Sequence, residues 1–202
     1  MNELKRISVL LNSEVSPALF LDRDGVINRR IEGGYVKFAN EFEFLPDVPQ
    51  ALAILNRFFS PVIIVTNQQG IGKGLMSEEQ LKAVHDQMLK ELGRHGARID
   101  RIYYCPALES SGDKCRKPSP GMAWKARKDF VKLNLNRSVM VGDSLSDMFF
   151  GRKVGMFNVF IGPPETARKY VGLIHLSFPA LIDFAHFISN LPSWRKENTL
   201  SV

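Results

Sequence analysis

Two carboxylates, Asp22 and Asp24, stand directly after the apolar run of residues 18–21. If that run is a buried strand, both side chains leave its carboxyl end on the same side, because side chains alternate along a strand, and Gly25 lets the backbone turn away. One carboxylate could then attack an electrophile while the other moves protons, with a divalent cation relieving their mutual repulsion. The same spacing occurs in Asx turns and calcium loops, but a calcium loop requires further acidic ligands, and here apolar residues follow the glycine.

A second polar turn follows the apolar run of residues 61–65. It contains Thr66, Asn67 and Gln68 and then the glycines of residues 70–74. A hydroxyl, side-chain amides and backbone N–H groups in such a turn can hold a phosphate. The spacing is that of neither a P-loop nor a dinucleotide fingerprint, and an ordinary strand-to-helix loop is the structural alternative.

Two cations, Arg116 and Lys117, lie next to prolines that restrict the backbone. A cation held beside an aspartate keeps the carboxylate ionised and offsets charge on a transferring phosphoryl group, and an arginine can also fork onto a second anionic group. Taken alone, such a basic pair is typical of solvent-exposed surface.

The apolar run of residues 138–141 leads to Asp143, and Asp147 follows four residues later. Asp143 could complete a Mg²⁺ shell of oxygen ligands with Asp22 and the backbone carbonyl of Asp24. Asp147 would orient that shell or a nearby cation. An acidic residue early in a helix is also favoured by the helix dipole alone, which is the structural alternative for Asp147.

The elements that must position these residues alternate between strands and helices. Alternation of this kind predicts a parallel sheet covered on both faces, a Rossmann-like doubly wound α/β fold. A serine and a glutamine three residues apart, Ser77 and Gln80, predict a capped helix start. The predicted strands are residues 18–21, 61–65, 102–104, 138–141 and 158–161, and the helical patterns cover 48–58, 81–92, 122–131 and 181–191.

The composition of the 202 residues, 45% of them hydrophobic, suits one compact domain. No apolar stretch approaches the length of about 20 residues that a membrane span requires, and no secretory pattern begins the chain, so we expect a soluble, cytoplasmic protein. Two cysteines, Cys105 and Cys115, are too few for a disulfide framework and are expected to be thiols or metal ligands. The net charge of +6 suits an anionic ligand or a solvated surface, and no basic run interleaved with aromatics indicates nucleic-acid binding.

Taken together, these sites resemble the haloacid dehalogenase superfamily. The resemblance implies that fold, a Mg²⁺ cofactor, and attack of Asp22 on phosphorus to give an aspartyl-phosphate. It also implies that Asp24 protonates the departing oxygen and later deprotonates the hydrolytic water, while Lys117 neutralises phosphoryl oxygens. The four motifs of the superfamily match residues 22–25, residues 66–68, Lys117, and residues 142–143 with Asp147.

The connecting sequence resembles the D-glycero-D-manno-heptose 1,7-bisphosphate phosphatases and their histidinol-phosphatase relatives. This resemblance implies a small phosphorylated substrate, and Arg116 would hold its second phosphate. Residues expected to bind substrate are Thr66, Asn67, Gln68, Arg116 and Tyr35. The matching segments are residues 20–28, 34–36, 43–44, 65–68, 103–106 and 115–118.

That subfamily has a zinc loop with Cys-x-His at one end and Cys-x-Cys at the other. Here Cys105 and Cys115 hold the outermost positions, but Ala107 replaces the histidine and Asp113 replaces the third ligand. Structural zinc takes four ligands, so zinc is not expected, and the altered loop leaves substrate specificity open.

The resemblance covers residues 17–191, which we expect to form the phosphatase domain, with an extension at 1–16 and a polar tail at 192–202. The chain has no room for a large cap, so an open site is expected, in a monomer. The expected activity is removal of one phosphate from the heptose bisphosphate. The alternatives are a histidinol-phosphate or other small-ester phosphatase, a nucleic-acid 3′-phosphatase and a non-catalytic binding protein.

Overall fold

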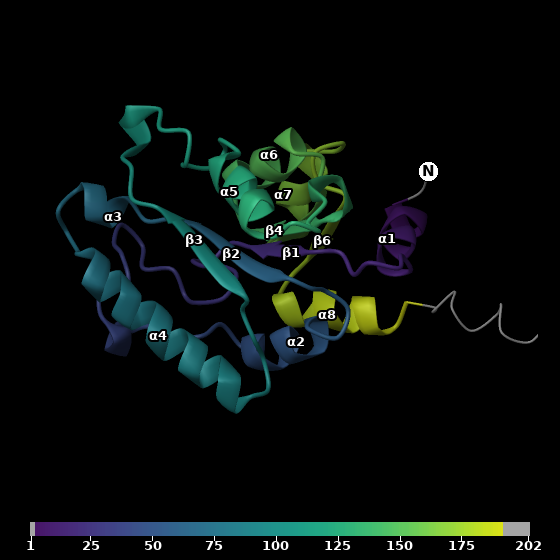
Figure 1. Ribbon diagram of the computed structural model, residues 1–202, viewed down its shortest axis with the longest axis horizontal. Helices are drawn as coiled ribbons and strands as arrows, with labels where there is room; N and C mark the ends of the chain where they lie inside the picture. The colour runs from purple at the N-terminus through teal and green to yellow at the C-terminus, as the bar shows by residue number, and fades with distance from the viewer. Residues whose placement is uncertain (1–2, 192–202) are drawn as a thin grey trace, which may run out of the picture.

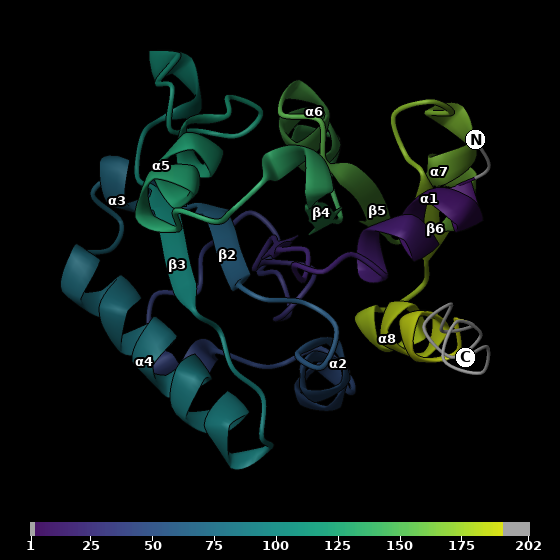
Figure 2. The same ribbon diagram turned by 45° about the vertical axis from the view of Figure 1, so that its right-hand side comes forward.

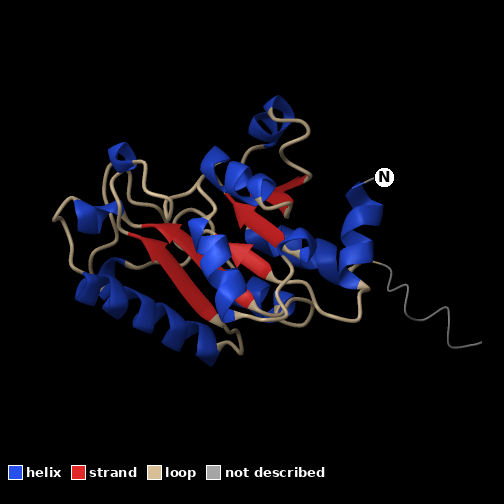
Figure 3. Ribbon diagram, turned by 45° about the horizontal axis from the view of Figure 1, so that its top comes forward, coloured by secondary structure: helices blue, strands red, loops and turns tan. Residues whose placement is uncertain are grey.

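The computed structural model describes residues 3–191, and a six-stranded sheet forms its centre. All strand pairs are parallel, in the order β3-β2-β1-β4-β5-β6. Figure 3 shows the strands in red between the blue helices. The predicted Rossmann-like α/β fold is thereby confirmed. The strands are β1 (Leu19–Leu21), β2 (Val62–Asn67), β3 (Arg101–Cys105), β4 (Val139–Gly142), β5 (Phe157–Ile161) and β6 (Leu176–Phe178).

Helices cover both faces of this sheet. Figure 1 shows α2, α4 and α8 on one face and α5, α6 and α7 on the other, and Figure 2 shows the same two layers after rotation. The helices are α1 (Glu3–Leu11), α2 (Val48–Leu55), α3 (Gln69–Gly72), α4 (Glu78–Arg94), α5 (Gly121–Asp129), α6 (Leu145–Lys153), α7 (Pro164–Lys169) and α8 (Leu181–Ser189), with 3₁₀ turns η1 (Ala39–Glu41), η2 (Glu109–Ser111) and η3 (Leu135–Arg137).

The two larger clusters of the hydrophobic core lie one on each face of the sheet, and strand β1 contributes side chains to both. Its outer residues, Leu19 and Leu21, belong to the cluster under α2 and α8, whereas Phe20 belongs to the cluster under α5. All three are 0% exposed, and full burial of such side chains contributes about 1.5–3 kcal/mol each. A strand buried on both faces is fixed in position, so the loop that follows it starts from a rigid point.

The predicted start of α4 is confirmed. The hydroxyl of Ser77 accepts the backbone N–H of Gln80 at 3.2 Å, and the Gln80 side chain accepts the backbone N–H of Ser77 at 2.7 Å. This reciprocal cap satisfies two backbone donors that the helix leaves unpaired. The inward face of α4 carries Leu81, Val84, His85, Met88 and Leu92, all buried.

The predicted helices and strands did not include α1, α3, α7 or β6, and α6 was implied only by the place of Asp147 early in a helix. The helix α1 buries Ile7 completely and packs against the same core cluster as α2 and α8. Its residues fall in the predicted 1–16 extension, and the division of the chain at residue 17 stays a prediction. The predicted tail at 192–202 lies outside the described residues. Between residues 3 and 191, the structure contains no helix with the length and apolar character that a bilayer span requires.

The central strands end together at one edge of the sheet. Leu21 of β1 pairs with Ile64 of β2 and with Val141 of β4. The backbone N–H of Asp22 extends this pairing by donating to Val141 at 2.9 Å. Because ligands bind outside the carboxyl ends of strands in open α/β sheets, the chemistry predicted for Asp22 belongs at this edge.

Candidate active site

A buried lysine joins three of the predicted motifs. The ammonium of Lys117 lies 2.7 Å from Oδ1 of Asp22, 2.6 Å from Oδ1 of Asp147 and 2.7 Å from the carbonyl of Val65. Burial alone would lower the pKa of Lys117, but the two aspartates outweigh it and raise the pKa above its usual value. The lysine is therefore a fixed positive charge.

The second carboxylate, Asp24, is held from three directions. A guanidinium nitrogen of Arg23 donates to both of its oxygens at 2.9 Å, and amide groups of Asn28 and Gln68 donate at 2.9 and 2.8 Å. Burial would raise the pKa of Asp24, but the Arg23 charge and these hydrogen bonds lower it below its usual value. Asp24 is consequently an ionised, well-oriented proton acceptor.

Oxygen atoms that suit a divalent cation gather beside these residues. Carboxylate oxygens of Asp22, Asp143 and Asp147 lie within 4.8 Å of one another. Burial raises the pKa of Asp22 to about 7 and that of Asp143 to about 6, so both gain from a further cation. Hard oxygen donors of this kind fit Mg²⁺.

Arg30, which was not predicted from the sequence, contacts two of the oxygens that are expected to bind Mg²⁺. Nη2 of Arg30 donates at 2.9 Å to the backbone carbonyl of Asp24 and at 2.9 Å to Oδ1 of Asp143. Nothing in the local sequence distinguishes Arg30 from its neighbour Arg29, which pairs with the exposed Glu43 instead. Only the fold brings Arg30 across to β4.

The predicted backbone turn occurs at Gly25, where φ is +99°. A Cβ atom there would lie 1.9 Å from Oδ2 of Asp143. Glycine is required both for the backbone conformation and for this close approach. It lets the two acidic motifs meet.

Side chains of the predicted phosphate-binding turn form hydrogen bonds with one another and with the backbone of Lys117. Thr66 accepts a hydrogen bond from the Gln68 amide at 2.9 Å, and both side chains are 1% exposed. Asn67 forms two hydrogen bonds with the backbone of Lys117, donating to its carbonyl at 3.1 Å and accepting its N–H at 3.0 Å. The end of β2 thus fixes the lysine loop.

Above these residues lies an open cavity of about 490 Å³. Tyr35 and Arg116, which are expected to bind substrate, line this cavity, and Lys73 joins them with its ammonium 5.5 Å from the Tyr35 ring centre. The Arg116 atom Nη1 is buried without a hydrogen-bond partner among the described residues, and Nη2 lies 3.9 Å from the exposed Glu109. The cavity therefore offers unsatisfied positive charge to a ligand.

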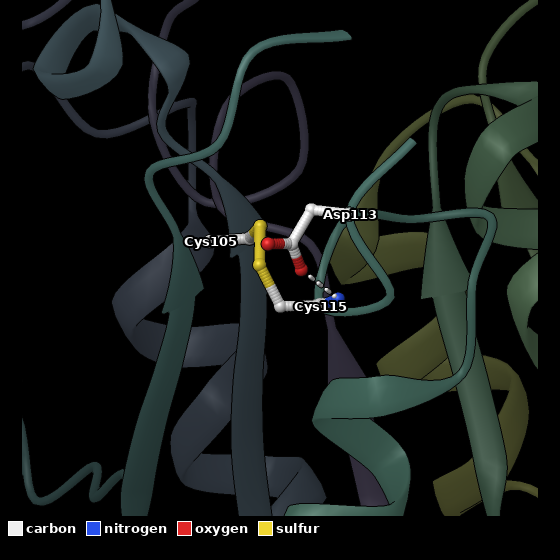
Figure 4. Close-up of side chains that lie close together, drawn as sticks. All are labelled: Cys105, Asp113 and Cys115. Atoms are coloured by element: carbon white, nitrogen blue, oxygen red, sulfur yellow. Dashed lines mark hydrogen bonds between the residues drawn. A yellow bond between two sulfur atoms is a disulfide. The ribbon is translucent and has the colours of Figure 1, made fainter. Parts of the chain in front are cut away.

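The expectation that Cys105 and Cys115 are thiols or metal ligands is wrong, because the structure joins them as a disulfide (Figure 4). Their Cα atoms lie 5.5 Å apart, a separation that disulfides normally span. The turn brings Cys115 back to the end of β3, which the sequence spacing did not reveal. Asp113 lies beside the pair and accepts the backbone N–H of Cys115 at 2.7 Å. The absence of zinc stays a prediction.

Known proteins are similar to this chain in sequence. A family described as polynucleotide kinase 3 phosphatase matches residues 19–160. A D-glycero-alpha-D-manno-heptose-1,7-bisphosphate 7-phosphatase of Mycobacterium tuberculosis is 38% identical over 174 residues, which cover 83% of this chain and 88% of that protein. The corresponding beta-heptose 7-phosphatase of Vibrio cholerae is 41% identical over 147 residues, or 69% of this chain and 77% of that protein.

A solved structure agrees with both relatives. The D,D-heptose 1,7-bisphosphate phosphatase of B. bronchiseptica, solved with magnesium and phosphate, superposes with a TM-score of 0.78 at 30% identity. The match covers 86% of this chain and 98% of that one. The predicted resemblance is confirmed: the chain belongs to the polynucleotide kinase 3 phosphatase family of haloacid dehalogenase-like phosphatases and is a phosphoric monoester hydrolase.

Proposed function

We propose that this phosphatase uses Mg²⁺ and an aspartyl-phosphate at Asp22 to remove the C7 phosphate from D-glycero-D-manno-heptose 1,7-bisphosphate. The contact between Lys117 and Asp22 carries the proposal. The Lys117 ammonium donates a hydrogen bond to Oδ1 of Asp22, whereas Oδ2 of Asp22 has no hydrogen-bond partner among residues 3–191. A carboxylate oriented through one oxygen can attack phosphorus with the other.

Two proton transfers involve Asp24 in this reaction. Asp24 is ionised in the free enzyme and takes up a proton from solvent when the anionic substrate binds. As an oxygen of Asp22 bonds to phosphorus, the bond from phosphorus to the sugar oxygen breaks, and Asp24 gives this proton to that oxygen. A water then attacks phosphorus, its proton passes to Asp24, and the electron pair of the broken bond returns to the Asp22 carboxylate. The hydrogen bonds from Asn28 and Gln68 support this role because they fix the carboxylate in place.

The metal fits the oxygens of the site. Asp22, the backbone carbonyl of Asp24 and Asp143 would hold Mg²⁺, which supplies positive charge against the phosphoryl oxygens. Asp147 would act on Lys117, since its carboxylate lies 2.6 Å from the ammonium. The relative from B. bronchiseptica, which was solved with magnesium and phosphate, supports this assignment.

The substrate assignment depends on the relatives and on the cavity. Both relatives at about 40% identity carry the 7-phosphatase name, although one is named for the alpha and the other for the beta sugar. A second phosphate would satisfy the buried nitrogen of Arg116 and lie near Lys73. Thr66, Asn67, Gln68 and Tyr35 would complete the substrate contacts.

Phosphate release with Mg²⁺ tests the proposal. We would supply both anomers of the heptose 1,7-bisphosphate, histidinol phosphate and a 3′-phosphorylated oligonucleotide, and identify the lost phosphate by ³¹P NMR. The expected result is that kcat/KM for one heptose anomer exceeds that for the other substrates at least 100-fold, with loss of the C7 phosphate. Asp22→Asn should abolish turnover.

Other outcomes contradict separate parts of the proposal. Faster hydrolysis of histidinol phosphate would overturn the substrate class. Preference for the oligonucleotide would favour the activity in the description of the matching family. Normal turnover by Asp22→Asn would exclude the aspartyl-phosphate.

A further inference from the structure

A buried arginine connects Asp24 to a helix outside the catalytic motifs. The side chain of Arg23 is 1% exposed, and Asp24 is its only ion-pair partner among the described residues. While Nη2 forks onto the two Asp24 oxygens, Nη1 lies 3.1 Å from Nε2 of His85. His85 belongs to α4, 62 residues further along the chain.

The contact with His85 requires a neutral imidazole. His85 is 7% exposed, and burial together with the Arg23 charge lowers its pKa to about 3. A guanidinium nitrogen can only donate, so Nε2 of His85 accepts and the ring proton resides on Nδ1. Asp24 and Asp86 also face this histidine, and their charges act in the opposite direction.

The position of His85 is fixed by its helix. The cap formed by Ser77 and Gln80 defines where α4 begins, and Leu81, Val84 and Met88 bury the same face of the helix. The planar guanidinium of Arg23 is therefore held at both ends, by a rigid helix at Nη1 and by a carboxylate at Nη2.

Removal of the histidine acceptor would release this arrangement. Nη1 would be left buried without an acceptor, and Nε of Arg23 already has none among the described residues. The guanidinium would turn toward another acceptor and change the angle of the Asp24 carboxylate. Displacement of a reacting group by about 1 Å can slow a reaction about 100-fold.

We propose that His85 is a positioning residue, which holds the Asp24 carboxylate through Arg23 for proton transfer. This inference rests on the proposed function, in which Asp24 handles both protons. Arg23 favours the ionised form of Asp24, so the hydrolytic step, where Asp24 accepts a proton from water, depends on the arrangement most directly.

The test compares three variants with p-nitrophenyl phosphate and the heptose bisphosphate. His85→Leu removes the acceptor, and His85→Gln retains an oxygen that can accept. Leu81→Ala, a buried residue on the same face of α4, reports on destabilisation alone. Melting temperature, kcat and KM are measured for each variant.

We expect His85→Leu to lower kcat at least tenfold with KM changed less than threefold, and His85→Gln to recover most of the loss. The nitrophenolate group leaves without a proton, so formation of the phosphoenzyme is spared while its hydrolysis slows. His85→Leu should then accumulate covalent phosphate on acid quenching, more than wild type or Leu81→Ala.

The inference is overturned if His85→Leu loses no more kcat than Leu81→Ala, or if its phosphoenzyme does not accumulate. Should leucine prevent folding, His85→Asn is read in the same way, because its carbonyl is too short to reach Nη1. Wild-type protein without Mg²⁺-dependent hydrolysis would contradict the proposed function instead, which keeps the two failures distinguishable.

Discussion

A guanidinium nitrogen of Arg30 lies 2.9 Å from a carboxylate oxygen of Asp143, although 113 residues separate the two in sequence. The same nitrogen contacts the carbonyl of Asp24. Both oxygens belong to the set assigned to Mg²⁺, so Arg30 and the metal repel each other there. Because Arg30 is half exposed, solvent limits this repulsion to about 1 kcal/mol.

Arg30→Gln should therefore bind Mg²⁺ about fivefold more tightly than wild type, as measured by titration calorimetry without substrate. The matched control is Arg29→Gln, which removes a neighbouring charge paired with Glu43 on the surface. Equal Mg²⁺ affinity in the two variants would show that Arg30 does not oppose the metal.

Gly25→Ala should abolish turnover and destabilise the fold. The substitution places an L side chain at φ +99° and a Cβ within 1.9 Å of Asp143, so either the turn or the carboxylate must move. Gly33→Ala is the control, because its φ is also positive at +64° but no atom lies within 4 Å of the new Cβ. We expect kcat to fall at least 100-fold for Gly25→Ala, and equal kcat in the two variants would contradict the close-approach argument.

The Cys105–Cys115 disulfide should stabilise the loop before Arg116. The cysteines are 10 residues apart, and cross-linking a loop of this length contributes about 3 kcal/mol through the entropy of the unfolded chain. Replacing both cysteines with serine should lower the free energy of unfolding, measured by urea titration, by about this amount. It should also raise KM, because the loop that positions Arg116 in the substrate cavity is no longer held. Mass spectrometry under non-reducing conditions and a zinc assay provide the control, and a stoichiometric zinc ion with free thiols would overturn the pairing.

The stability of the protein should depend on pH through His85. Its pKa is about 3 in the folded protein and near 6.5 when unfolded, so between these values the unfolded chain binds more protons. The stabilisation from neutral His85 is complete above pH 6.5 and is lost as the pH falls toward 3. At pH 5 this contribution is about 2 kcal/mol smaller than at pH 7.5.

Urea unfolding at several pH values checks this prediction. The difference between wild type and His85→Leu should shrink as the pH falls from 7.5 to 5. Leu81→Ala retains the histidine, so its difference from wild type should stay constant. A difference for His85→Leu that does not change with pH would mean that His85 is not held neutral.

The motif residues could be predicted because strand composition marks their positions. Asp22 and Asp143 each come at the end of a short apolar run that is typical of a buried strand, and parallel strands of this kind end at a common edge. The predicted strand at residues 61–65 ended too early, because β2 continues to Asn67 and includes Thr66. The strand β6 could not be found, because its three residues are all only partly buried and show no apolar run.

Contacts made at a distance could not be predicted. The sequence contains Arg23 within the first motif and His85 within a helical pattern, but only the packing of α4 against the sheet brings them to 3.1 Å. Arg30 likewise has no periodic or spacing signal. The cysteine pairing depends on a turn whose path is not encoded in a regular pattern.

The paired hydrogen bonds between Asn67 and the Lys117 backbone imitate one rung of a β-ladder with a single side chain. The disulfide joins the two ends of the loop at residues 106–114, and the hydrogen bonds from Asn67 hold the backbone of Lys117 just beyond it. Changes in the length or sequence of that loop can then be absorbed without displacing the ammonium from Asp22. The length and sequence of this loop are thereby separable from the phosphoryl chemistry of Asp22 and Lys117, so the first can vary while the second is retained.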